Sequence, residues 1–370
     1  MSARFLTVVL ERAFNMRDGF GREIDYMRIS VIDSCNLNCY YCNPCDNNEH
    51  CHALNILSVK EVLCIVRAAT RLGIKHFRLT GGEPLLHPQL DEMVLQIKKI
   101  PGVSSVSLTT NAVLLAQHAK WLKEAGIDSI NVSLDTIDAS EYERITKKPL
   151  LEEVKNGINA AIECGIRVKI NVVLTPQTDV VALTRYVAKK GTDIRFIEMM
   201  PVGEGHTNGV EPYKKVIGTL SKLYGEPCRI NTEKTKEINS GNDKRKIPDN
   251  GPAEYYIFPE LGIRVGLIQA IHGKFCDTCN RIRVTADGRL MPCLGSSVTM
   301  DLVPDSWDFA DDVEKDFAIV RALRAAIKAK PRCHNFNDNA VTYTKTTETK
   351  TIEIEAAEVN AARNMSRIGG

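Results

Sequence analysis

The chain has 370 residues, with 48 Lys and Arg against 46 Asp and Glu, and 44% of its residues are hydrophobic. These proportions are those of an ordinary globular protein and exclude a disordered, collagen-like or disulfide-scaffold chain. The net charge of 48 − 46 = +2 gives no overall attraction to nucleic acid or to an anionic membrane. No apolar run approaches the length of a membrane span, and the N-terminus lacks a signal-like apolar core. We therefore expect a cytoplasmic protein that binds neither nucleic acid nor membrane.

Short β-rich runs alternate with amphipathic helical patterns over the first half of the chain. Strands are predicted at Asp25–Asp33, Lys75–Gly81, Val103–Asn111, Asp128–Asp135, Arg167–Leu174 and Asp193–Met199. Helices are predicted at Ser58–Leu72, Leu114–Ala125 and Leu151–Cys164. The first of these helices has Ser58 as its N-cap, with Glu61 three residues further on. Repeated strand–helix units indicate a parallel sheet with right-handed crossovers.

Within each predicted strand, polar and apolar residues alternate. A parallel strand covered on both faces would be almost continuously apolar. Because side chains alternate between the faces of a strand, one face packs on helices and the other lines a polar lumen. The lumen face includes Arg28, Arg78, Thr109, Ser133 and Lys169. Six units are present where a complete barrel has eight, so we predict an α/β fold, an incomplete (βα)6 TIM-type barrel that is open on one side.

The rest of the chain is less regular and predicts a second module. It contains a polar loop (Lys234–Pro252), a helix near Val313–Ala329 and a Thr-, Lys- and Glu-rich tail (Thr342–Glu355) that we expect to be mobile. The predicted organisation is an N-terminal extension (1–20), the partial barrel (21–203), a C-terminal module (204–340) and a polar tail (341–370).

Twelve cysteines are the unusual feature of the composition. Cys35, Cys39 and Cys42 follow the first strand, at the end where barrel active sites form. Three thiolates on so short a loop can hold three irons of a cubane cluster and leave the fourth iron without a protein ligand. The spacing alone leaves two alternatives open, a zinc site and a ferredoxin-like cluster. The zinc site would take its fourth ligand from Cys45, Cys51, His50 or His52. The ferredoxin-like cluster would use Cys39, Cys42 and Cys45.

A second trio is formed by Cys276, Cys279 and Cys293. On spacing alone it is either another three-cysteine cluster site or half of a zinc ribbon, with His272 as a fourth ligand. The four remaining cysteines are isolated and are predicted to be small buried hydrophobes. They are Cys64, Cys164, Cys228 and Cys333.

The motifs resemble a known family. The loop CNLNCYYC, which begins at Cys35, resembles the cluster loop of radical S-adenosylmethionine (SAM) enzymes, and Gly81-Gly82-Glu83-Pro84 resembles their contact to the methionine amino group. The segment from Phe275 to Leu294 resembles the C-terminal cluster motif of the GTP 3',8-cyclase family of molybdenum cofactor biosynthesis. DYMRISVIDSCN, TTNAVLL, SLDT, VKINVVL, RFIEMMPVGEG and the terminal IGG agree in the same order.

This resemblance implies a barrel of the radical SAM type with a C-terminal iron–sulfur module. It implies two 4Fe-4S clusters, one on each cysteine trio, with SAM on the first. Matching positions for SAM contacts are Tyr41, Gly82, Glu83, Ser133 and Met200. Matching positions for GTP contacts are Arg28, Arg78, Thr109, Lys169, Arg281, Ile282 and Arg283. Functional roles in the active site are implied for Arg195, Gly369 and Gly370.

The reaction implied by the resemblance converts GTP to (8S)-3',8-cyclo-7,8-dihydroguanosine 5'-triphosphate. An external flavodoxin- or ferredoxin-like one-electron reductant starts SAM cleavage, and the resulting 5'-deoxyadenosyl radical takes hydrogen from C3' of GTP. The carbon radical then attacks C8 of the guanine. A separate cyclic pyranopterin monophosphate synthase uses the product, and the resemblance is compatible with a homodimer.

The sequence also departs from the family pattern, with Ala112 where Gly is usual and His76, beside Lys75, where a triphosphate-binding lysine is common. Two alternative functions stay open. One is another radical SAM enzyme with an auxiliary cluster that acts on a peptide or small molecule. The other is a zinc-stabilised binding module without catalysis.

Overall fold

A computed structural model describes residues 16–42, 56–202, 209–230, 251–296, 298–302, 312–334, 336, 343–347 and 350–354. Several sequence expectations lie outside this part of the chain. They concern Cys45, Cys51, His50, His52, most of the polar loop, Gly369 and Gly370.

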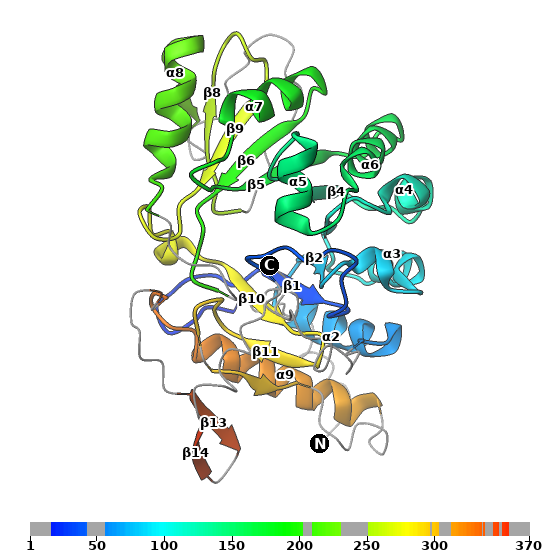
Figure 1. Ribbon diagram of the computed structural model, residues 1–370. Coiled ribbons are helices and arrows are strands. Elements are labelled where there is room, and N and C mark those ends of the chain that lie inside the picture. Colours follow the sequence, from blue (N-terminus) through cyan, green and yellow to red (C-terminus); the bar gives the residue numbers. More distant parts are fainter. Residues whose placement is uncertain are drawn as a thin grey trace.

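Six parallel strands, neighbours in chain order, form the centre of one large sheet (Figure 1). They are β1 (Tyr26–Ser30), β2 (His76–Thr80), β3 (Ser105–Thr110), β4 (Ser129–Ser133), β5 (Val168–Val173) and β6 (Asp193–Ile197). Each lies within a predicted strand, so the alternating pattern located all six. The confirmed fold is α/β with a partial TIM-type barrel.

The C-terminal part of the chain extends this sheet at both edges. Beyond β1 come β10 (Arg281–Val284), β11 (Arg289–Met291) and β12 (Met300–Asp301); beyond β6 come β9 (Arg264–Ile268), β8 (Glu254–Ile257) and β7 (Cys228–Ile230). Because β10 pairs in parallel with β1 and β9 in parallel with β6, eight consecutive strands of this sheet are parallel. The described sheet has twelve strands with separate ends, so it is open, as predicted.

The helices cover the outer side of the sheet. They are α2 (Val59–Arg71), α3 (Leu90–Lys98), α4 (Leu115–Glu124), α5 (Ala139–Thr146), α6 (Leu151–Glu163), α7 (Val180–Lys189), α8 (Gly218–Tyr224) and α9 (Asp312–Lys328). Shorter turns of helix are η1 (Pro84–Leu86), η2 (Tyr213–Ile217) and η3 (Cys276–Thr278). At the start of α2, the Ser58 side chain accepts from the Glu61 backbone N–H, and Glu61 accepts from the Ser58 backbone N–H, the predicted capping box.

The core lies between the sheet and these helices. Apolar strand residues such as Met27, Ile29 and Phe77 are fully buried, as is Ile65 of α2. Burying this apolar surface is the main favourable contribution to folding. The alternate residues of the same strands therefore face the opposite side, where they surround a cavity.

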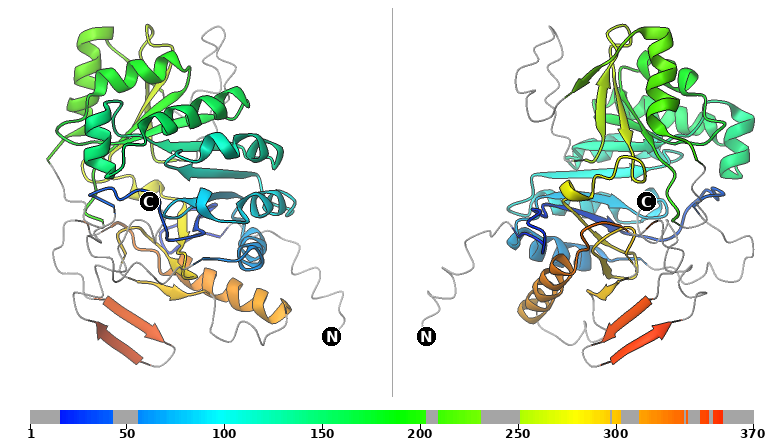
Figure 2. Two further views of the ribbon diagram at one scale, coloured as in Figure 1. Left: turned by 45° about the vertical axis from the view of Figure 1, so that its right-hand side comes forward. Right: turned by 90° about the vertical axis from the view of Figure 1, so that its left-hand side faces the viewer.

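The described part of the polar tail forms a small antiparallel hairpin of β13 (Tyr343–Thr347) and β14 (Lys350–Ile354). It belongs to a separate two-stranded sheet and lies apart from the main sheet in all views (Figures 1 and 2). The sequence suggested no regular structure here, although its β-branched threonines favour strands. None of the described helices is long and apolar enough to cross a membrane.

Candidate active site

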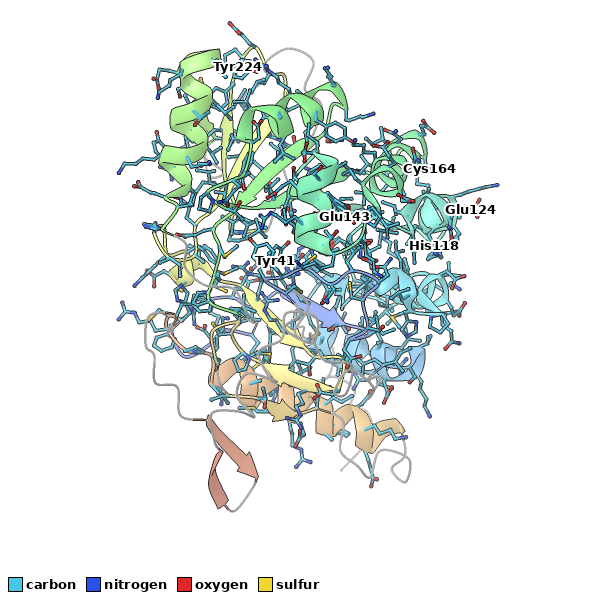
Figure 3. All side chains as sticks on the ribbon, viewed as in Figure 1. Tyr41, His118, Glu124, Glu143, Cys164 and Tyr224 are labelled. Atoms are coloured by element: carbon cyan, nitrogen blue, oxygen red, sulfur yellow. The ribbon has the colours of Figure 1, made fainter. Side chains whose placement is uncertain are left out.

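Both cysteine trios line one cavity on the inner face of the sheet, the first beyond the carboxyl end of β1 and the second beside its amino end, where Tyr26 pairs with Arg281. The cavity lining includes Cys35, Cys39, Cys42, Cys276, Cys279 and Cys293. In Figure 3, Tyr41, which also lines the cavity, lies in the interior, whereas Cys164 and His118 lie on the helical side. Folding thus brings together two motifs that are more than half the chain apart in sequence.

The first cysteine loop is held against the glycines that follow β2. The Gly82 N–H donates to the Ile32 carbonyl at 2.7 Å, and the Glu83 N–H donates to the Ser34 carbonyl at 2.8 Å. A Cβ atom on Gly82 would lie only 2.1 Å from the Ser34 carbonyl oxygen. A glycine is required here because two backbone segments approach closely, and this approach fixes the start of the loop.

The thiols of this loop are buried. Burial raises the pKa of Cys35 to about 11 and also raises that of Cys39. Cys35 Sγ accepts from the Leu37 N–H at 3.5 Å and from Asn111 Nδ2 at 3.7 Å. Metal binding deprotonates a cysteine ligand, so these thiols would become thiolates on binding a cluster.

Each cysteine trio offers three thiol donors. Among the described side chains, no group of three or more His, Cys, Asp and Glu residues is gathered closely enough to hold one metal ion. Three thiolates that each bind a different iron stand further apart than ligands that share one zinc. Cys45, Cys51, His50 and His52, the further ligands of the zinc alternative, lie outside the described residues.

Most residues expected to contact SAM line the same cavity as the first trio. Tyr41, Gly82, Ser133 and Met200 line the cavity. Tyr41 donates its hydroxyl hydrogen bond to Asp135, a buried carboxyl whose pKa burial raises to about 6.

Glu83 differs from that expectation because its side chain is not among the cavity-lining residues. It is only 1% exposed, and its carboxylate accepts hydrogen bonds from Thr110 Oγ1 and the Asn111 N–H, both at 2.7 Å. It also accepts from the Leu85 N–H at 3.0 Å. Glu83 therefore ties the glycine turn to the end of β3, and the neighbouring Gly82 reaches the cavity.

The second trio lies around the β10–β11 hairpin. Cys276 begins η3, Cys279 lies two residues before the start of β10, and Cys293 lies two residues after the end of β11. Arg281 Nη2 lies 3.7 Å from Cys279 Sγ. Burial alone would raise the pKa of Cys279, but the charges of Arg281 and Lys330 outweigh burial and lower it to about 7. Basic side chains thus favour the thiolate, the form that binds iron.

His272, the candidate fourth ligand of a zinc ribbon, is engaged elsewhere. Its ring Nδ1 contacts the Glu198 carboxylate, which also accepts from the Ile271 N–H at 2.7 Å. His272 does not line the cavity.

Three guanidinium groups lie on adjacent strands between the two trios. In the parallel registers, Arg28 is opposite Arg283 on one side and Arg78 on the other. All three line the cavity. Burial, with the repulsion of the neighbouring arginines, lowers the pKa of Arg28 and lowers that of Arg283 to about 10. Buried like charges are costly unless an anion joins them, so this row is suited to a phosphate group.

The remaining residues expected to contact GTP fall into two groups. Thr109 and Arg281 line the cavity, as does Arg195, whose Nε donates to Asn171 at 2.9 Å. Two others do not line it. Lys169 is 4% exposed, with its ammonium 5.8 Å from the Tyr255 ring centre, and the Ile282 side chain lies in the hydrophobic core.

Comparisons with known proteins agree with this geometry. Residues 29–182 match the radical SAM superfamily, and residues 192–336 match the family described as Molybdenum Cofactor Synthesis C. The chain is 35% identical to a GTP 3',8-cyclase of Clostridium perfringens over 324 residues, which cover 87% of this chain and 95% of the relative. It is 37% identical to that of Peptoclostridium acidaminophilum, with 87% of this chain and 94% of the relative covered. The chain belongs to the GTP 3',8-cyclase family.

Solved structures support the fold of this family member. The crystal structure of Streptococcus suis SuiB aligns with a TM-score of 0.54 and 15% identity, covering 82% of this chain and 68% of that one. The form of SuiB with bound S-adenosylmethionine aligns with a TM-score of 0.51. The radical SAM fold expected from the CNLNCYYC loop is therefore confirmed.

Both departures from the pattern of the GTP 3',8-cyclase family have a structural setting. Ala112 is fully buried at a positive φ of 65°, a backbone region that costs a residue with a Cβ atom. His76 does not line the cavity. Its Nδ1 lies 2.8 Å from Ser105 Oγ, and its Nε2 lies 4.0 Å from Asp25.

The isolated cysteines are only partly as predicted. Cys64 is buried and Cys164 half-buried, but Cys228 and Cys333 are exposed. The prediction of burial rested on residue type alone and is wrong for these two. Cys228 lies on the edge strand β7 and Cys333 lies in a loop, and both positions are at the surface.

Sequence reasoning also missed residues around the cavity. Asp135 lies on the polar face that the alternation of its strand identifies, so that signal could have found it. Glu198 lines the cavity and lies within the RFIEMMPVGEG motif but was given no role, and Lys330 lines it without belonging to any motif. Their roles depend on contacts with distant backbone atoms, which leave no local pattern.

Proposed function

We propose that this chain is a radical SAM lyase that converts GTP to (8S)-3',8-cyclo-7,8-dihydroguanosine 5'-triphosphate, the first step of molybdenum cofactor biosynthesis. The observation that carries the proposal is the shared cavity. Two cysteine trios line it, and Arg28, Arg78 and Arg283 lie side by side within it. The relatives named GTP 3',8-cyclase, which this chain matches over most of their length, support the same reaction.

The donor sets fit two iron–sulfur clusters. Cys35, Cys39 and Cys42 would hold the cluster that binds SAM, and the second trio would hold a cluster that faces the guanine base. When loaded, the first cluster and SAM supply the radical that starts the reaction. Around it, Tyr41, Gly82, Ser133 and Met200 would contact SAM. The protein itself contributes position, charge and exclusion of water.

Binding of the triphosphate would fall to the arginine row. Each guanidinium can donate two parallel hydrogen bonds to a phosphate group. Because Arg28, Arg78 and Arg283 repel one another, an anion between them would relieve this repulsion and also gain charge-assisted hydrogen bonds. Thr109, on the lumen face of β3, would extend the site, and the backbone at Ile282 would lie beside the base. Lys169 lies outside the cavity lining, so the role that the resemblance implies for it is not part of this proposal.

Arg281 would link the two parts of the substrate. It lies 3.7 Å from Cys279 Sγ and shares β10 with Arg283. This position suits a group that orients the nucleotide between the second cluster and the arginine row. Arg195 and the terminal Gly369 and Gly370 are proposed to complete the site. An external one-electron reductant and a downstream cyclic pyranopterin monophosphate synthase are the expected partners, with a homodimer as the assembly to test.

The test is anaerobic incubation of reconstituted protein with SAM, dithionite and GTP, with 5'-deoxyadenosine and the cyclised nucleotide measured together. Cys35→Ala should form no 5'-deoxyadenosine. Cys293→Ala should form it slowly, without cyclised product, and Cys228→Ala, at an exposed position, should match the unsubstituted protein. Coupled turnover by Cys293→Ala would contradict the role of the second trio.

Two outcomes separate the alternatives. If 5'-deoxyadenosine forms with a peptide or another small molecule but not with GTP, the protein is a different radical SAM enzyme. A colourless protein with stoichiometric zinc, in place of roughly eight iron and eight sulfide per chain, would support the zinc-stabilised binding module.

A further inference from the structure

A buried lysine, Lys330, is hydrogen-bonded to the backbone beside the second cysteine trio. Lys330 follows the last turn of α9 and is 3% exposed. Its Nζ donates to the Arg281 carbonyl and to the Pro292 carbonyl, both at 2.8 Å. One of these carbonyls belongs to β10 and the other directly precedes Cys293. The ammonium therefore joins both sides of the hairpin at the end where Cys279 and Cys293 leave it.

The register of the hairpin explains why this link fixes the cysteines. Arg283 pairs with Met291 in antiparallel register, and continuing by two residues brings Arg281 opposite Cys293. Cys279 is two residues before Arg281. A bond from one ammonium to the carbonyls of Arg281 and Pro292 therefore sets the separation of the two strand ends, and with it the separation of the two sulfur atoms.

A second cation links the same segment to the remaining cysteine. Arg22 is 8% exposed, and its Nη1 donates to the Cys276 carbonyl at 2.7 Å and to the Arg332 carbonyl at 2.9 Å. Its Nε bonds to Asp18 at 2.5 Å. The charge of Arg22 is thus paired with a carboxylate, so Arg22 acts here as a structural link.

The charge of Lys330 faces a different environment. Its Nζ donates to two uncharged carbonyl groups, those of Arg281 and Pro292. Lys330 also lines the cavity with both cysteines. A buried ammonium beside thiolates offsets their negative charge, and such groups around metal ligands tune the affinity and potential of the metal.

We propose that Lys330 is a positioning residue of the second site, which sets the spacing of Cys279 and Cys293 and supplies the positive charge that stabilises their cluster in its reduced form. This inference rests on the second cluster of the proposed function. Reduction adds negative charge, so a nearby cation makes reduction easier. Removal of the ammonium should shift the midpoint potential of this cluster to a more negative value and weaken its retention.

The test uses the full chain with Cys35, Cys39 and Cys42 replaced by Ala, so that only the second trio can hold a cluster. Lys330→Met removes the charge and the donors but keeps the apolar stem. Lys330→Arg keeps the charge, and Lys328→Met is the matched control because Lys328 is exposed near the same helix end. The measurements are iron and sulfide per chain, the rate of iron loss to a chelator, and the midpoint potential from an EPR-monitored reductive titration.

We expect Lys330→Met to lose iron about 10- to 100-fold more readily, the range typical of groups that support metal ligands. Its potential should be more negative than that of Lys328→Met, and Lys330→Arg should restore most of that difference. Equal potentials and equal iron loss for Lys330→Met and Lys328→Met would overturn the inference.

Two further outcomes are also decisive. Lys330→Met could fail to hold any cluster. In that case, a Lys330→Arg protein with the same midpoint potential as the background protein supports the role of the charge. A Lys330→Arg protein that also holds no cluster refutes that role. If the background protein with Lys330 intact takes up no iron, the second cluster of the proposed function fails instead.

Discussion

Gly82 is the position where one methyl group should disturb the SAM site most directly. In Gly82→Ala, the new Cβ would lie 2.1 Å from the Ser34 carbonyl oxygen and 2.5 Å from that of Asp33. Ordinary contact begins at 3.4 Å, so the backbone must separate by about 3.4 − 2.1 = 1.3 Å. Both atoms belong to the loop that leads into Cys35, and a backbone carbonyl cannot rotate away as a flexible side chain can.

The expected cost is at the upper end of the range for overpacking, about 1–3 kcal/mol in the free energy of unfolding. A misplacement of about 1 Å near reacting groups can lower a rate about 100-fold. We therefore expect Gly82→Ala to retain both cysteine trios but to form 5'-deoxyadenosine about 100-fold more slowly and to bind SAM more weakly. The assays are anaerobic SAM titration, 5'-deoxyadenosine formation and thermal unfolding.

Gly218→Ala is the control. A Cβ on Gly218 meets nothing within 4 Å, and its backbone is helical. This substitution should leave SAM binding unchanged and stabilise the fold by up to about 1 kcal/mol. If Gly82→Ala binds SAM as tightly and unfolds at the same temperature as Gly218→Ala, the close approach of the two backbone segments does not position the loop, and the reasoning is refuted.

Three further predictions follow from buried groups. Arg283→Met should weaken GTP binding about 10- to 100-fold through lost charge-assisted hydrogen bonds while leaving the melting temperature of the ligand-free protein the same or higher, because it relieves repulsion. The measurement is the affinity for GTP by calorimetry, with Arg289→Met, at a half-exposed arginine, as the control. Equal GTP affinities for the two variants would contradict this prediction. Because burial raises the pKa of Glu83 from 4.5 to about 7, its carboxyl favours the folded state below pH 4.5 and loses that contribution as the pH rises through 7. Denaturant unfolding should therefore show wild type losing up to about 3 kcal/mol relative to Glu83→Gln between pH 4.5 and 7, and a constant difference would refute this. Ala112→Gly should raise the free energy of unfolding by up to about 1 kcal/mol, because relief of the positive φ exceeds the added freedom of the unfolded chain, and a lower melting temperature would argue against strain at this position.

The sequence by itself determined the six central strands, the first cysteine loop and the lumen face. These features depend on local patterns. Side chains of a strand alternate between two faces, so Arg28, Arg78 and Thr109 could be assigned to the cavity before their neighbours were known. Likewise, three cysteines on one short loop are close in space in any fold.

Only the tertiary structure decided how the C-terminal part completes the site. The short runs of β9 and β10 have no pattern that specifies a partner, and pairing with β6 and β1 depends on the free energy of the whole sheet. That pairing places Arg283 beside Arg28, although 255 residues separate them. It also makes Ile282 a core residue, because the residue between two cavity-facing arginines must face the helices. Lys330 and Glu83 act through hydrogen bonds to backbone groups that are distant in sequence. Every residue type has a backbone carbonyl, and all except proline have an N–H, so the sequence does not mark the partners of such bonds. Only the path of the folded chain decides them.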